Sequence, residues 1–134
     1  MAKIIDIEGI GPVYAQKLIA IGITTTNKLL KKGATPKGRE ELAKETGISG
    51  DLILEWVNHA DLYRIKGVAE EYSDLLEEAG VDTVPELAQR NPQNLYAKLV
   101  ETNDMKKLVR QLPSQRQVAD WVEQAKALPR QIHY

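Results

Sequence analysis

The chain has 134 residues, of which 43% are hydrophobic and 28% charged, and its formal net charge is −1. This size and composition are typical of a globular protein with a buried core. Cysteine is absent and histidine occurs only twice, which excludes disulfides, thiolate catalysis and the common zinc sites. No apolar run approaches the roughly 18 residues of a membrane span, and no signal peptide is recognisable. We therefore expect a cytoplasmic protein without membrane contact.

Helix start and stop signals predict the elements in chain order. Prolines and threonines open the predicted helices, glycines close several of them, and apolar residues recur at helical spacing. The helices are expected over 12–20, from a cap at Thr25 or Thr26 to 32, from Thr35-Pro36 to a stop at Gly47, from a cap at Ser49 to about 63, and over 69–79, 83–90, from 91–92 onward and 114–128. No segment alternates with the period of two that strands require. The predicted class is all-α.

Two stretches of the chain, 58 positions apart, share one pattern of residues. The residues of the first copy are Ile7, Gly9, Ile10, Tyr14, Leu18, Gly22, Ile23, Thr25 and Leu29, and their counterparts are Ile65, Gly67, Val68, Tyr72, Leu76, Gly80, Val81, Thr83 and Leu87. A second register, shifted by 65, relates the Trp56 segment to the Trp121 segment. This repeat predicts two units, 1–61 and 62–134, with an inserted helical segment at about 103–111.

The segment Ile7-Glu8-Gly9-Ile10-Gly11-Pro12 resembles the helix-hairpin-helix motif of DNA-repair proteins and ligases. In that motif two glycines allow a tight turn, and the next helix presents free amides with a partial positive charge. A backbone phosphate fits there without any base being read. The residues expected to contact nucleic acid, including nearby lysines, are Gly9, Ile10, Gly11, Val13, Lys17, Lys28, Lys31 and Lys32.

The second copy departs from this motif. Ala69 stands where the second glycine should be, and Glu70 and Glu71 follow at once. Two carboxylates in the first turn satisfy the helix dipole and repel a phosphate. We therefore interpret the second turn as structural. Trp56 and Trp121, which lie on apolar stripes, are predicted core residues.

As a whole, the chain resembles a bacterial family of domains of unknown function, numbered 4332 and described as helix-hairpin-helix-like. The strings that carry the resemblance include Ile7-Glu8-Gly9-Ile10-Gly11-Pro12, Thr46-Gly47-Ile48-Ser49 and Ala60-Asp61-Leu62-Tyr63-Arg64-Ile65-Lys66-Gly67-Val68. The resemblance covers nearly all residues. It implies an all-α fold of tandem duplicated helix-hairpin-helix (SAM-like) units packed as one compact domain, and it implies no activity.

A helix-hairpin-helix needs a helix before its glycine turn, and residues 1–6 are too short to supply one. The Trp121 helix, conversely, has no hairpin after it. We therefore expect the Trp121 helix to fold back against the first hairpin and fill this vacancy, within the chain or from a partner chain.

No arrangement of side chains suggests catalysis, so the protein is expected to be no enzyme and to need no cofactor, metal or small-molecule substrate. The leading hypothesis is sequence-independent binding of the nucleic-acid (DNA) backbone through the first hairpin. The alternative is a protein–protein interaction or oligomerisation module. Residues 62–101 hold 8 acidic against 4 basic groups, and residues 102–134 hold 6 basic against 3 acidic. An acidic stretch of one chain could thus meet a basic stretch of another.

Overall fold

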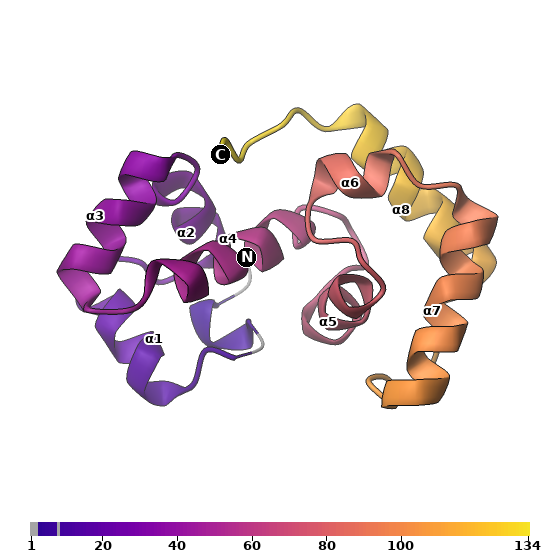
Figure 1. Cartoon of the computed structure of the whole chain (residues 1–134), viewed down its shortest axis with the longest axis horizontal. Helices are drawn as coiled ribbons and strands as arrows, with labels where there is room; N and C mark the ends of the chain where they lie inside the picture. Colours follow the sequence, from indigo (N-terminus) through magenta and orange to yellow (C-terminus); the bar gives the residue numbers. More distant parts are fainter. Residues whose placement is uncertain (1–2, 8) are drawn as a thin grey trace. The chain divides into compact units, whose positions relative to one another are not determined.

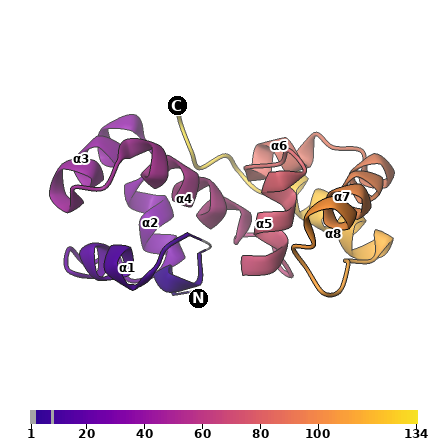
Figure 2. The ribbon, with the colours of Figure 1, turned by 60° about the horizontal axis from the view of Figure 1, so that its bottom comes forward.

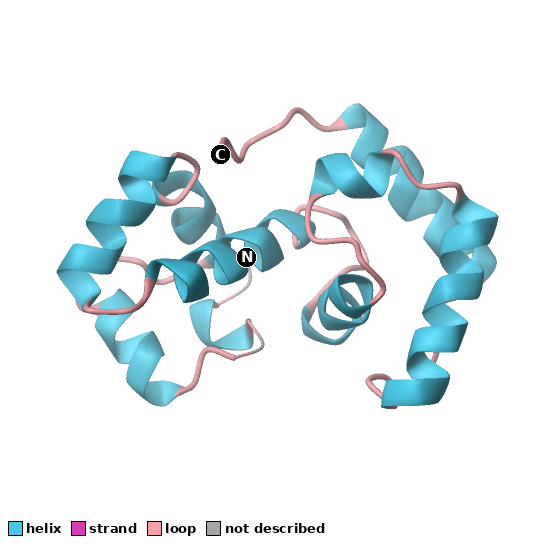
Figure 3. Cartoon of the chain, in the orientation of Figure 1, coloured by secondary structure: helices cyan, strands magenta, loops and turns pink. Residues whose placement is uncertain are grey.

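The computed structural model describes residues 3–7 and 9–134, and over these residues it is helical with no strand (Figure 3). Lys3 and Thr25 form an isolated antiparallel bridge. The helices are η1 (Ile4–Asp6), α1 (Pro12–Ile19), α2 (Thr26–Lys32), α3 (Pro36–Thr46), α4 (Gly50–Leu62), α5 (Glu70–Glu78), α6 (Val84–Ala88), α7 (Pro92–Lys106) and α8 (Gln115–Ala127). The predicted all-α class is confirmed.

The chain divides into two compact units. Unit 1 comprises the chain up to Asp61 together with Arg130–Tyr134, and unit 2 comprises Leu62–Pro129. Unit 1 thus contains α1 to α4, and unit 2 contains α5 to α8 (Figure 1). Within unit 2, α7 and α8 lie side by side in two views (Figure 1, Figure 2), and α6 packs against α8.

Side-chain caps fix where the helices begin, and corresponding helices of the two units use the same cap. The Thr25 hydroxyl accepts a hydrogen bond from the Lys28 amide at the start of α2. The Thr83 hydroxyl accepts one from the Glu86 amide at the start of α6. Each cap satisfies an amide that the helix itself leaves without a partner.

A glycine turn packs against a tryptophan in each unit. Gly9 has φ +91°, and a Cβ placed there would lie 3.5 Å from Trp56 Nε1. Tyr14 of α1 packs on the same indole, with ring centroids 5.1 Å apart and planes tilted by 57°. Trp56 itself is only 1% exposed. The predicted packing role of this tryptophan is confirmed.

The same contact recurs in unit 2. Gly67 has φ +94°, and a Cβ placed there would lie 3.1 Å from Trp121 Nε1. Tyr72 packs on Trp121 with centroids 5.3 Å apart and planes tilted by 52°. Trp121 is 2% exposed and belongs to the core of this unit.

The expectation that the Trp121 helix fills a vacancy on the first hairpin within the chain is therefore wrong. α8 packs against α6 and α7 of its own unit, and its tryptophan meets the second glycine turn. The first turn has its tryptophan already, on α4. Each tryptophan thus packs on the glycine turn of its own unit.

The inserted segment at 103–111 is only partly helical. α7 continues to Lys106, and Lys107 then adopts a left-handed conformation with φ 56°. The Asn103 side chain holds the following loop, since it accepts from the Val109 amide (2.9 Å) and donates to the Val109 carbonyl (3.2 Å). The prediction of added helix is therefore wrong beyond Lys106.

Residues 130–134 form a strap on unit 1, although the sequence placed them in the second unit. The His133 amide donates to the Ala34 carbonyl at 2.7 Å, and Ile132 is 3% exposed. The Arg39 guanidinium donates to the carbonyls of Gly33 (2.8 Å) and His133 (2.9 Å). It also lies 5.7 Å from the ring centroid of Tyr134. Arg39 thus joins the strap to the α2–α3 loop, and it supplies a donor to the buried carbonyl of Gly33.

The two glycines of the first turn should differ in what they contribute to stability. Gly9→Ala should lower the free energy of unfolding by about 2 kcal/mol, because alanine is strained at positive φ. Gly11 has an extended backbone and open space around it, so Gly11→Ala should cost only about 0.5 kcal/mol. Urea denaturation followed by Trp56 fluorescence in a Trp121→Phe background measures both. Equal costs would contradict the assigned roles.

Arg39→Met should destabilise unit 1 by about 2 kcal/mol, because it leaves two carbonyls without their donor. The same denaturation assay measures the loss. Lys44→Met is the matched control, since Lys44 lies on the same helix and its ammonium is largely exposed at 3.7 Å from Glu40. If the two substitutions cost the same, the strap contact contributes nothing to stability.

Candidate nucleic-acid interface

The first glycine turn has two buried isoleucines and two exposed glycines. Ile7 and Ile10 are 1% and 4% exposed, and they fix the turn to the core of unit 1. The Ile10 amide donates to the Ile7 carbonyl at 3.1 Å. Of the predicted contact residues, Ile10 therefore offers neither an exposed side chain nor a free amide. Gly9 and Gly11, by contrast, are exposed.

Within residues 3–7 and 9–134, no side chain caps the start of α1. Gly11 is the N-cap residue and has no side chain, Pro12 occupies the first helical position, and no acidic residue lies in the first turn. The amides of Val13 and Tyr14 make no hydrogen bond with any residue that the structure describes. Val13 is 70% exposed. The donors that a helix leaves unpaired at its N-terminus thus have no partner among the described residues.

The corresponding end of α5 is different. Its N-cap is Ala69, and Glu70 and Glu71 occupy the first turn. Both carboxylates lie on exposed residues next to the helix N-terminus. They offset the positive end of the helix dipole, whereas α1 keeps it.

Lys17 is exposed on α1, four residues after Val13. Residues with this spacing share one face of a helix. Lys17 makes no hydrogen bond or ion pair with the described part of the chain. Its ammonium group therefore adds a positive charge to the face that carries Val13.

The other three predicted lysines lie elsewhere. Lys28, Lys31 and Lys32 line a hollow of about 590 Å³ that also includes Gly22 and Ile23, just after α1. The glycine turn precedes α1, and an eight-residue helix is about 12 Å long. The structure therefore splits the predicted contact residues between the two ends of this helix.

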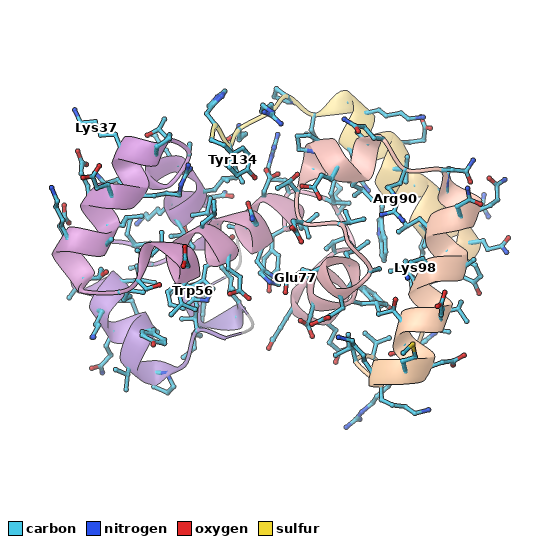
Figure 4. All side chains as sticks on the ribbon, viewed as in Figure 1. Lys37, Trp56, Glu77, Arg90, Lys98 and Tyr134 are labelled. Carbon is cyan, nitrogen blue, oxygen red and sulfur yellow. The ribbon has the colours of Figure 1, made fainter. Side chains whose placement is uncertain are left out.

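Lys37 completes the basic lining of the hollow. It projects outward at the start of α3, while Trp56 lies on the side of α4 that faces α1 (Figure 4). Arg39, two positions after Lys37, is 9% exposed and binds the strap instead. No sequence signal separates these two roles, because the carbonyl that Arg39 binds belongs to a residue 94 positions away.

Lys32 and Glu41 form an ion pair across the hollow, with Nζ 2.6 Å from Oε2. The hydrogen bond to Glu41 raises the pKa of the Lys32 ammonium. The same bond lowers the pKa of the Glu41 carboxyl. Both groups therefore stay charged at neutral pH, and Glu41 is engaged by its partner.

Residues for a metal are few in the described part of the chain. In unit 2 the carboxylates of Asp74, Glu77 and Glu78 lie within 4.8 Å of one another. Lys106 already pairs with Glu78 at 2.6 Å. A cluster of carboxylates at or near the surface does not by itself define a metal site. Among the described residues, no helix is long and apolar enough to cross a membrane.

Comparison with known proteins gives one result. No curated protein and no solved structure matches the chain. The model of a family described as a domain of unknown function, DUF4332, matches residues 8–128, which is most of the chain. The protein therefore belongs to the DUF4332 family.

Proposed function

We propose that unit 1 binds the phosphate backbone of nucleic acid, DNA in the first instance, without reading the bases. The observation that carries the proposal is the open N-terminus of α1 behind an exposed glycine turn. Amides without partners and the positive end of a helix dipole both favour a bound anion. The role is binding alone, without a catalytic step or a cofactor.

The contrast between the units supports this assignment. Both units contain the glycine turn packed on a tryptophan, so the turn itself serves the fold. Only unit 1 combines it with a first helical turn that has no carboxylate. Packing of the turn on a tryptophan does not require the residues that follow it to be uncharged, since the same packing occurs in unit 2 beside two glutamates.

The affinity for DNA should be modest, because it comes from the few groups around the first glycine turn. Residues 1–61 hold 8 basic and 8 acidic groups and residues 130–134 add only Arg130, so unit 1 has no large basic excess. Lys17 is the cation on the helix face of the open turn. A few phosphate contacts give weak binding that falls steeply as salt rises, because each contact releases counterions.

Val13→Glu should weaken DNA binding by about tenfold. It places a carboxylate in the first turn of α1, as Glu71 does in α5, and Val13 is exposed enough for the fold to accept the change. The assay is fluorescence anisotropy with labelled single-stranded and duplex DNA at about 50 mM salt and again at higher salt.

Two control variants accompany this measurement. Val13→Gln has nearly the same shape without the charge, and it should retain binding. Ala97→Glu makes the same charge change on an exposed position of α7 in unit 2, and it should also retain binding. The proposal would be falsified by absence of DNA binding at low salt, or by an equal loss in the Ala97 variant.

A further inference from the structure

The hollow of unit 1 is a basic concavity between α2 and α3. Its volume of about 590 Å³ falls in the range of small-molecule sites. Its basic side chains come from both helices and are those of Lys28, Lys31, Lys32 and Lys37. Ile23, 8% exposed, supplies an apolar side chain to the lining.

A glycine brings the two helices close enough to form this hollow. Gly38 lies in the first turn of α3, and a Cβ placed there would overlap the carbonyl oxygen of Lys32, at the end of α2. Only glycine permits so close an approach. The approach places Lys37, next to Gly38, on the same concavity as Lys31 and Lys32.

The charges of the hollow do not cancel. Glu41 is the acidic residue of the lining, and Lys32 engages it at 2.6 Å. Lys28 Nζ donates to the Thr24 hydroxyl at 3.1 Å, which leaves its charge unneutralised. Lys31 and Lys37 are exposed and pair with no described residue. Ammonium groups gathered around one concavity raise the local positive potential and attract anions.

We propose that this hollow is a second phosphate site, which binds a compact, multiply charged phosphate: the terminal phosphate of a strand or a free polyphosphate. An internal phosphodiester has a single negative charge and a sugar on each side. A terminal phosphate has a charge of about −1.5 to −2 at neutral pH and is free on one side, so it can enter a concavity. Lysine binds phosphate as a point charge and needs no fixed planar geometry.

The site is distinct from the open end of α1. It lies beyond the other end of that helix, and it offers side-chain ammonium groups where the turn offers backbone amides. Its existence does not depend on the proposed function, because a free polyphosphate tests it without nucleic acid.

Titration with sodium tripolyphosphate, followed by amide NMR spectra, tests the site. Shifts should appear in the segment from Gly22 to Glu41, and binding measured from this segment should fall at least about tenfold in a Lys31→Glu/Lys37→Glu variant. The matched control is Lys98→Glu/Lys126→Glu, which makes the same charge change on exposed positions of unit 2. The control should bind at this segment as the unaltered protein does. Absence of shifts, or equal losses in the two double variants, would overturn the proposal.

A second arm identifies the source of the phosphate. DNA strands with a 5′-phosphate and with a 5′-hydroxyl are compared by anisotropy, labelled at the other end. A several-fold preference for the phosphate that the Lys31/Lys37 variant abolishes supports strand ends as the ligand. Tripolyphosphate binding without this preference supports a free polyphosphate. Failure of Val13→Glu to weaken DNA binding would contradict only the proposed DNA binding at the start of α1. The tripolyphosphate titration would still test whether the hollow binds phosphate.

Discussion

The contact between a positive-φ glycine and an indole ring organises each unit of this protein. Gly9 turns the backbone in a conformation that other residues rarely adopt, and the absence of a Cβ lets the turn lie against Trp56. Tyr14, in the first turn of α1, packs on the same ring. This contact fixes the direction in which α1 leaves the turn. Because the tryptophan occupies the buried side, the amides at the start of α1 are left on the exposed side.

The same constraint allows the units to differ chemically without a change of fold. The positions that the packing needs are occupied by the same residue types, Gly9 and Gly67, Trp56 and Trp121. The exposed positions just after the turn carry no packing demand, and there α1 has Pro12 and Val13 while α5 has two glutamates. One turn geometry thus presents a positive helix end in unit 1 and a neutralised one in unit 2.

Local signals in the sequence predicted most helix boundaries, because caps such as Thr25 and Ser114 act on amides only three residues away. The predicted openness of the glycine turn also follows from local residues. The glycine turn on which each tryptophan packs could not be predicted, because the repeat register does not show which turn a helix contacts. The strap was missed for a similar reason: Arg39 and His133 lie 94 positions apart. The hollow depends on how Gly38 packs against Lys32, which no spacing in the sequence reveals.

The loop between α2 and α3 contacts the strap and also borders the hollow, so residues 130–134 help to position the lining of the hollow. The loop from Gly33 to Thr35 joins α2 to α3 and so sets the separation of their lysines. Arg39 binds the Gly33 carbonyl, and His133 binds the Ala34 carbonyl. Both bonds hold the loop against the strap, which follows α8 in the chain. The loop that spaces the lysines of unit 1 is therefore held by residues 130–134, which follow α8 in the chain and belong to unit 1.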